Sequence, residues 1–289
     1  MMIADVDCDS VVYLNGDYVR LGDAQVSVLD RGFIFGDGIY EVVPAYKGKP
    51  FRMAAHLSRL MRSLAELRID TGFTREDWER LWLDMLARSG QGRDCMVYLQ
   101  VTRGVAKREH GFPKVPVQPT VFCMVAPFVR ESAARVSGLR TVSLDDIRWH
   151  RCDIKSVSLL GNVLAKQAAV EAGVDDVIQF RDACLSEGSS SNIWVVRDGV
   201  LLAPVRDHHI LEGVRYAFLA ELAEQQGIAF EERSISRTEV NQADELLLTS
   251  ATKEVLPIVE HDGKPVGTGQ AGPVYRQLRA AYDEVIAAL

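Results

Sequence analysis

Two short stretches decide the fold and the chemistry predicted for this chain, Arg151-Cys-Asp-Ile-Lys155 and Ser186-Glu-Gly-Ser-Ser-Ser-Asn192. The first places a single amine, that of Lys155, between apolar residues. The second leads a carboxylate, that of Glu187, into a turn of glycine and serine, whose small side chains let a planar ligand lie close to the backbone. Together the two stretches predict a site that uses one amine and one carboxylate on a flat ligand.

This pair of groups is what a pyridoxal phosphate enzyme requires. The amine of Lys155 can form an imine with the cofactor aldehyde, and Glu187 can keep the pyridinium nitrogen protonated so that the ring withdraws electrons from a substrate. Each residue also has an ordinary interpretation, Lys155 as a lysine on an edge strand and Glu187 as a turn carboxylate. The cofactor is therefore predicted from the two residues together and not from either alone.

Composition indicates a globular protein that acts on small molecules. Of the 289 residues 47% are hydrophobic, which suffices for one large domain or two ordinary ones, each with its own core. The formal net charge is −7, and the chain has no basic run, so we expect neither nucleic acid nor an anionic membrane as a partner. The acidic N-terminus and the lack of a run as long as a membrane span predict that the protein is not exported.

Cysteine and histidine positions predict neither disulfides nor a metal site. The five cysteines are scattered without a Cys-x-x-Cys pair, which is typical of a protein of the reducing cytoplasm. His150, His208 and His209 match no metal-ligand spacing, so we expect them to be structural or surface residues. We expect no metal.

The pattern of apolar residues predicts an α+β protein of two domains. A small N-terminal α/β domain is expected over residues 1–128, a linker over 129–138 and a larger C-terminal domain of β ribbons and helices over 139–289. The pair Asn15-Gly16 predicts a two-residue hairpin turn in the first domain. Helices are expected over 53–69, 78–86, 158–172, 214–226 and 274–289, and strands over 11–14, 17–20, 96–103, 120–126, 177–180, 192–196, 200–202, 229–232 and 245–249.

Several segments could hold the anionic parts of the cofactor and the substrate. Residues 213–215 begin a predicted helix, whose backbone amides and dipole attract a phosphate, and residues 249–252 could form a second cradle; ordinary helix capping is the alternative. Arg108 and His110 lie on one side of an extended segment, which suits a carboxylate or, alternatively, an exposed polar loop. Arg59 points away from the leucine stripe of its helix, so the helical wheel predicts a solvated side chain.

Over nearly its whole length the chain resembles the class IV aminotransferases, the fold-type-IV pyridoxal phosphate enzymes, and among them the D-amino acid transaminases most. This resemblance rests on Tyr13-Leu-Asn-Gly16, Asp30-Arg-Gly-Phe-Ile-Phe-Gly-Asp-Gly-Ile-Tyr-Glu41, His56-Leu-Ser-Arg-Leu60, Gln100-Val-Thr-Arg-Gly104, Lys155, Glu187 and Leu211-Glu-Gly-Val214. It implies a two-domain α+β fold with a barrel-like C-terminal domain. It also implies a homodimer, with the active site close to the subunit boundary.

The resemblance implies a role for each matching residue. Lys155 would carry the cofactor and move the proton between the substrate α-carbon and the cofactor C4′, and Glu187 would be the pyridinium partner. The other positions implied to bind the cofactor are Arg59, Val214, Arg215, Ala251 and Thr252 at the phosphate, and Ser190 and Leu211 beside the ring. The implied carboxylate trap consists of Tyr40, Arg108 and His110.

Three features depart from the usual pattern of the family. Trp194 stands where Phe or Tyr is usual, Ala203 where Thr is usual, and Arg215-Tyr216 where Thr-Arg is usual. The threonine hydroxyl on the phosphate is thus absent, and the guanidinium of Arg215 could replace its bond by turning inward. The change concerns cofactor affinity more than the type of reaction.

The expected reaction is transamination of a D-amino acid. Its amine would pass to the cofactor and then to 2-oxoglutarate or pyruvate. The stereochemical expectation rests on Arg108 and His110, since a carboxylate trap fixes which bond of Cα stands perpendicular to the ring. The alternatives are an L-branched-chain aminotransferase, a 4-amino-4-deoxychorismate lyase and a non-catalytic protein that binds pyridoxal phosphate.

Overall fold

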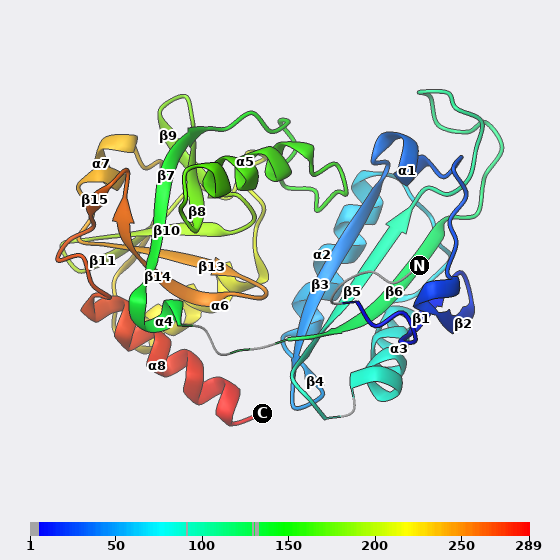
Figure 1. The fold of residues 1–289 in the computed structure, drawn as a ribbon, viewed down its shortest axis with the longest axis horizontal. Coiled ribbons are helices and arrows are strands. Elements are labelled where there is room, and N and C mark those ends of the chain that lie inside the picture. Colours follow the sequence, from blue (N-terminus) through cyan, green and yellow to red (C-terminus); the bar gives the residue numbers. More distant parts are fainter. Residues whose placement is uncertain (1–5, 91, 129, 131–132) are drawn as a thin grey trace. The chain divides into compact units, whose positions relative to one another are not determined.

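Two structural units make up the chain in the computed structural model, which describes residues 6–90, 92–128, 130 and 133–289 (Figure 1). Unit 1 comprises Met1–Val129 and Ile154–Leu159, and unit 2 comprises Arg130–Asp153 and Leu160–Leu289. The linker predicted over 129–138 includes residues 129, 131 and 132, which lie outside the described residues. No helix among the described residues has both the length and the apolar character needed to cross a membrane.

Unit 1 is an antiparallel sheet with helices on one face (Figure 1). Its elements are β1 (Val11–Leu14), β2 (Asp17–Arg20), η1 (Leu21–Asp23), α1 (Arg31–Phe35), β3 (Gly38–Tyr46), β4 (Lys49–Pro50), α2 (Met53–Glu66), α3 (Arg75–Met85), η2 (Leu86–Gly90), β5 (Cys95–Thr102) and β6 (Thr120–Pro127). The six strands follow the order β2-β1-β6-β5-β3-β4. Helix α2 packs on β3 and α3 packs on β6, so Leu57, Leu60, Trp78 and Trp82 are buried against the sheet.

Local sequence signals explain how two of these elements begin. Asn15 and Gly16 adopt φ angles of 53° and 108°, which confirms the predicted hairpin turn, and β1 pairs with β2 on either side of it. Thr74 caps α3, because its hydroxyl accepts the backbone N–H of Asp77 at 3.2 Å while Asp77 Oδ2 accepts the N–H of Thr74 at 2.9 Å. Both elements follow from short-range chemistry alone.

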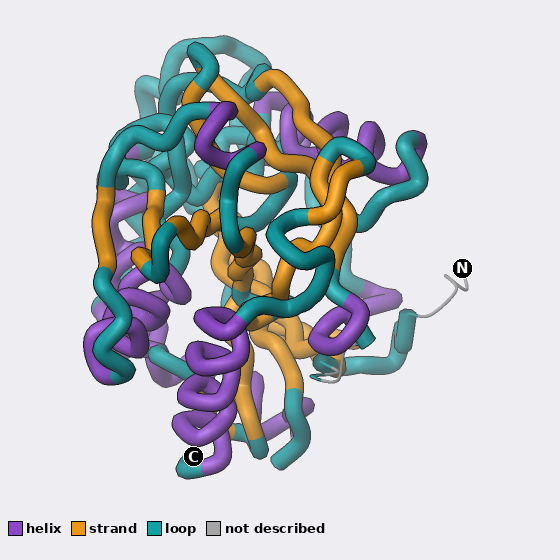
Figure 2. The backbone as a smooth tube through the Cα atoms, turned by 90° about the vertical axis from the view of Figure 1, so that its left-hand side faces the viewer, coloured by secondary structure: helices purple, strands orange, loops and turns teal. Residues whose placement is uncertain are grey.

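Unit 2 is a mixed sheet with five helices around it among the described residues. Its elements are α4 (Ala134–Ser137), β7 (Leu139–Asp145), α5 (Leu160–Glu171), β8 (Asp176–Arg181), β9 (Cys184–Gly188), β10 (Asn192–Arg197), β11 (Val200–Ala203), α6 (Val214–Gln225), β12 (Phe230–Glu232), α7 (Arg237–Asn241), β13 (Glu245–Ser250), β14 (Glu254–His261), β15 (Lys264–Pro265) and α8 (Pro273–Ala287). The strand order is β12-β11-β10-β13-β14-β7-β8-β9, with β15 on β14. Figure 2 shows α8 leading the chain to its C-terminus.

The sheet of unit 2 curls on itself. Strands β7 and β8 are parallel, and β7 also runs parallel to β14, whereas β10, β13 and β14 pair antiparallel. Strand β9, at the end of the order, packs against β10 as well as pairing with β8. This return of the edge toward the middle of the sheet agrees with the expected barrel-like domain and leaves the ends of β9 and β10 close together.

Candidate active site

Lys155 lies beside strand β3 of unit 1, with its backbone fixed on both sides. Its carbonyl accepts the N–H of Tyr40 at 3.0 Å, and its own N–H donates to Ser63 Oγ of α2 at 3.4 Å. The amine Nζ of this half-buried lysine lies 4.0 Å from the centroid of the Tyr40 ring. The structure therefore brings together two of the predicted residues, Lys155 and Tyr40.

Arg59 is buried, at 8% exposure, so the prediction of a solvated side chain is wrong. Its Nε and Nη2 donate to the two carboxylate oxygens of Glu41 at 2.7 and 2.8 Å, and His56 Nδ1 lies 2.8 Å from Glu41 Oε2. Burial favours a higher pKa for Glu41, but the charge and hydrogen bonds of Arg59, with those of His56, lower that pKa far below its ordinary value. A buried carboxylate on β3 thus draws Arg59 inward and fixes its guanidinium.

Arg108 and His110 lie in the long loop between β5 and β6 and meet at one aromatic side chain. The guanidinium carbon of Arg108 is 5.6 Å from the centroid of the Phe35 ring, and the His110 ring centroid is 5.4 Å from it. Arg31 of α1 anchors the loop by donating to two of its backbone carbonyls at 2.6 and 3.3 Å. The structure therefore brings Arg108 and His110 together, both exposed, on a loop with a fixed backbone.

Glu187 lies near the end of strand β9 of unit 2 and is buried in a polar network. Arg148 donates to Glu187 Oε2, and Asn192 Nδ2 donates both to Glu187 Oε1 at 3.0 Å and to the carbonyl of Leu211 at 2.9 Å. Burial raises the pKa of Glu187 above its ordinary value, although the neighbouring charge of Arg148 opposes the shift. Asn192 thus joins Glu187 to Leu211, another predicted residue.

Sequence reasoning missed Arg148, which holds Glu187 in place. Besides Glu187, Arg148 pairs with Asp146 at 2.8 Å. Burial opposes ionisation of Asp146, but the hydrogen bonds and charge of Arg148 lower the pKa of Asp146 to about 2. No motif marks Arg148, since its partner on β9 lies far along the sequence; Asn192, by contrast, closes the quoted glycine and serine stretch.

The N-terminus of helix α6 has the features of an anion site. Its N-cap, Gly213, offers no side chain to the first backbone N–H groups, and a Cβ there would lie 2.3 Å from Asn192 Oδ1. Arg215 is buried, and its Nη2 donates to the carbonyl of Ala251 at 3.2 Å. Val214, Arg215 and Ala251 therefore lie together. Exposed positions are taken by Thr252, in the turn after β13, and by Ser190, in the turn after β9.

Two of the departures from the family pattern pack against each other. The Trp194 and Tyr216 rings lie 4.6 Å apart, and Trp194 Nε1 donates to Thr249 Oγ1 at 2.9 Å. The Tyr216 hydroxyl donates to the carbonyl of Pro204 at 3.1 Å. Trp194 and Tyr216, which is itself a residue of α6, therefore belong to one buried cluster. Arg215, the remaining change at this helix, faces Ala251 instead.

The chain is similar to aminotransferases both in sequence and in structure. A D-alanine aminotransferase of Staphylococcus haemolyticus is 38% identical over 275 residues, which cover 95% of this chain and 97% of that protein. The branched-chain amino acid aminotransferase of Escherichia coli has a TM-score of 0.91 at 23% identity, covering 96% of this chain and 95% of the other. The branched-chain aminotransferase of Thermoproteus uzoniensis, solved with norvaline, has a TM-score of 0.88 at 27% identity, covering 96% and 95%. The fold is that of an aminotransferase.

The family follows from the sequence match. The chain belongs to the class IV aminotransferases, because the family description "Amino-transferase class IV" matches residues 38–261. It is a pyridoxal phosphate-dependent enzyme whose substrates are amino acids and 2-oxo acids. The expected family, fold class and cofactor are thereby confirmed. Of the predicted site residues, Tyr40, Arg59, Arg108, His110 and Lys155 belong to unit 1, and Glu187, Ser190, Leu211, Val214, Arg215, Ala251 and Thr252 belong to unit 2.

Proposed function

We propose that the chain is a D-amino acid transaminase that passes the amine to 2-oxoglutarate or pyruvate. The observation that carries this proposal is the pairing of Arg108 and His110 at the Phe35 ring, on a loop whose backbone Arg31 holds. A guanidinium and an imidazole that both lie near one aromatic ring on this loop suit a substrate carboxylate. The 38% identity with the D-alanine aminotransferase of Staphylococcus haemolyticus supports the same donor class.

The residues of each unit fit pyridoxal phosphate. The N-terminus of α6 suits the phosphate, because its N-cap is Gly213 and makes no side-chain cap hydrogen bond, and we assign this role to Val214 and Arg215. The carbonyl of Ala251 already fixes the guanidinium of Arg215 there. Further phosphate ligands are assigned to Arg59, Ala251 and Thr252, and the positions beside the ring to Ser190 and Leu211. Glu187 suits the ring nitrogen, because its carboxylate is buried and held in place by Arg148 and Asn192.

When bound, the cofactor supplies an electron-withdrawing ring next to the substrate amine. Lys155 Nζ would take the proton from the substrate Cα and deliver it to the cofactor C4′. This transfer requires the amine to stay close to the substrate Cα. The Tyr40 ring centroid lies 4.0 Å from Nζ, a contact that favours this position of the amine. Tyr40, Arg108 and His110 would bind the substrate carboxylate and so present the Cα–H bond of a D-amino acid to Lys155.

A homodimer in the cytoplasm is part of the same proposal. Leu160, Val163 and Leu164 of α5 follow helical spacing and are 71%, 58% and 49% exposed, which gives that helix an apolar outer face. A second copy of the chain would cover such a face. All five cysteines are free thiols, which agrees with a reducing compartment.

D-alanine is expected to bleach the visible absorption band of the bound cofactor, whereas L-leucine leaves it unchanged. The measurement is the near-UV and visible spectrum of the holoenzyme with each amino acid, followed by chiral analysis of the glutamate formed from 2-oxoglutarate. Bleaching by L-leucine alone would replace this proposal with the branched-chain one. Turnover of aminodeoxychorismate without a 2-oxo acid would identify a lyase, and a band indifferent to every substrate would identify a non-catalytic protein.

Glu187→Gln is expected to lower kcat by about 10²-fold, near the lower end of the range for a group that takes part in general acid–base catalysis. The amide keeps the hydrogen bond to Asn192 but cannot keep a proton on the ring nitrogen. Steady-state kcat and the position of the cofactor band are the measurements, with Glu231→Gln, an exposed position of β12, as the matched control. Unchanged kcat in a variant with the wild-type circular dichroism spectrum would remove Glu187 from its assigned role.

A further inference from the structure

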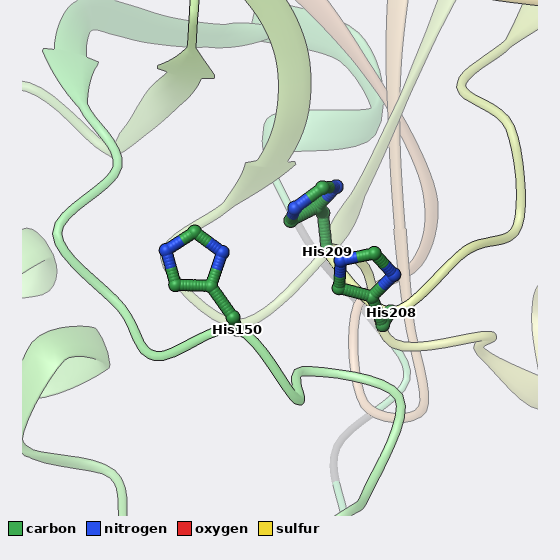
Figure 3. A group of neighbouring side chains, drawn as sticks. All are labelled: His150, His208 and His209. Carbon is green, nitrogen blue, oxygen red and sulfur yellow. The ribbon is translucent and has the colours of Figure 1, made fainter.

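Three histidines of unit 2 converge although they come from two separate loops (Figure 3). His150 lies in the loop after β7, and His208 and His209 lie side by side in the loop between β11 and α6. Each imidazole offers one nitrogen, and these three nitrogens all lie within 4.8 Å of one another. Figure 3 shows the His208 and His209 rings close together and the His150 ring across from them.

Hydrogen bonds fix the backbones that carry these rings. The N–H of Cys152 donates to the carbonyl of His208 at 2.8 Å, which ties one loop directly to the other. Arg148 Nη2 donates to the carbonyl of His209 at 3.3 Å, and Arg181 Nη2 donates to the carbonyl of Arg148 at 2.9 Å. Arg148, which also binds Glu187, therefore helps to fix the backbone of this cluster.

The charges around the cluster suit a cation. His209 is oriented by Asp207, whose carboxylate accepts the His209 backbone N–H at 2.7 Å and lies 3.1 Å from its Nδ1, so that Nε2 is left to bind a ligand. Arg181 Nη1 lies 3.5 Å from His150 Nδ1, and Arg181 shares the carboxylate of Asp146, at 3.2 Å, with Arg148.

The geometry is close to that of a three-imidazole metal centre. Nitrogens bound at about 2.0–2.1 Å to one tetrahedral ion lie about 3.3 Å apart, so the three rings need only small side-chain rotations. His150 and His208 are exposed and can make these rotations, and the open side leaves room for water as a further ligand. Three neutral imidazoles with water are a donor set typical of zinc, nickel and copper.

We propose that His150, His208 and His209 bind one divalent transition-metal ion of this class, at a site separate from the residues assigned to pyridoxal phosphate. The expectation that these histidines are structural or surface residues came from spacing alone, which cannot detect ligands on two distant loops. A bound ion would link those two loops to each other and to the segment that carries Arg148.

The test is titration of the chelator-treated holoenzyme with Ni²⁺ by isothermal calorimetry. One ion is expected to bind per chain, and each of His150→Gln, His208→Gln and His209→Gln is expected to weaken binding by at least about 10-fold. Asp207→Asn should weaken it by roughly 10-fold as an orienting partner. Arg206→Gln, an exposed position of the same loop, is the matched control and should bind as the wild type does.

A second measurement separates this site from the cofactor and the cysteines, which also attract metals. The Cu²⁺ complex should show electron paramagnetic resonance splitting from three nitrogens in the wild type, and this signal should disappear in the triple histidine variant. All variants change exposed or partly exposed side chains, and circular dichroism checks that they fold. Wild-type affinity for Ni²⁺ in the triple variant, or no binding by the wild type at millimolar Ni²⁺, would overturn the proposal.

Discussion

Lys155→Ala is expected to lower kcat by roughly 10³-fold or more, near the upper range for a general acid–base group. The variant loses the amine that takes the proton from the substrate and the only group assigned to hold the cofactor covalently. Folding should survive, because Lys155 is only half-buried and its backbone hydrogen bonds to Tyr40 and Ser63 do not involve the side chain. The measurements are kcat and, after borohydride reduction, the mass of the peptide that contains residue 155.

The control for this variant is Lys264→Ala, an exposed lysine of β15, which should keep full activity and the cofactor adduct at residue 155. A small primary amine added to the Lys155→Ala enzyme should restore part of the proton transfer, since it replaces the missing base in the vacated space. The assignment fails if the variant keeps more than a tenth of the wild-type kcat, or if the adduct persists on another lysine.

Local chemistry made part of this molecule predictable. The Asn15-Gly16 turn and the apolar stripes of α2 and α3 depend on neighbours in the sequence, so the first hairpin and these two helices were predicted from the sequence alone. Strand β14 was not predicted, and it contains Pro257, a residue that is uncommon within a central strand. Pro257 lies inside β14, Glu254–His261, and pairs with Leu247 of β13.

The candidate site also contains residues that could be predicted from the sequence and partners that could not. Lys155 and Glu187 stand out because each lies in a distinctive local stretch, and the resemblance to a family added the remaining positions. The partners that give these residues their properties could not be read from the chain, because contacts between distant segments determine them. Arg148 reaches Glu187 from the loop after β7, and β3 places Glu41 where it pairs with the buried Arg59. A helical wheel carries no information about such a partner.

The three-histidine cluster extends this point to sites outside the family pattern. His208 and His209 are adjacent in sequence, but His150 joins them through tertiary contacts: its ring centroid lies 5.5 Å from that of His209, Cys152 donates to the His208 carbonyl, and Arg148 donates to the His209 carbonyl. The same arginine therefore supports two candidate sites, the Glu187 carboxylate and the histidine cluster. A change at Arg148 would disturb both.

Glu41→Gln is expected to destabilise unit 1 by about 3–5 kcal/mol at pH 7, the range for breaking a buried ion pair on one side. The amide leaves the buried charge of Arg59 without its counter-ion and turns an N–H₂ group toward either Arg59 or His56. The measurement is the urea dependence of hydrogen exchange in peptides from β3 and α2, which reports this unit directly. Glu109→Gln, at an exposed pair with Lys107, is the control and should change stability by less than about 0.5 kcal/mol.

The pH dependence of this effect separates the ion pair from simple packing. The pKa of Glu41 in the folded chain is far below its ordinary value of 4.5, so its contribution is fully present above about pH 4.5 and is lost as the pH falls toward the folded value. The gap in stability between the wild type and Glu41→Gln should therefore be widest at neutral pH and narrow steadily below about pH 4.5. A gap that stays constant down to about pH 3 would mean that shape, and not charge, makes Glu41 necessary, and Arg59 would then need another explanation for its burial.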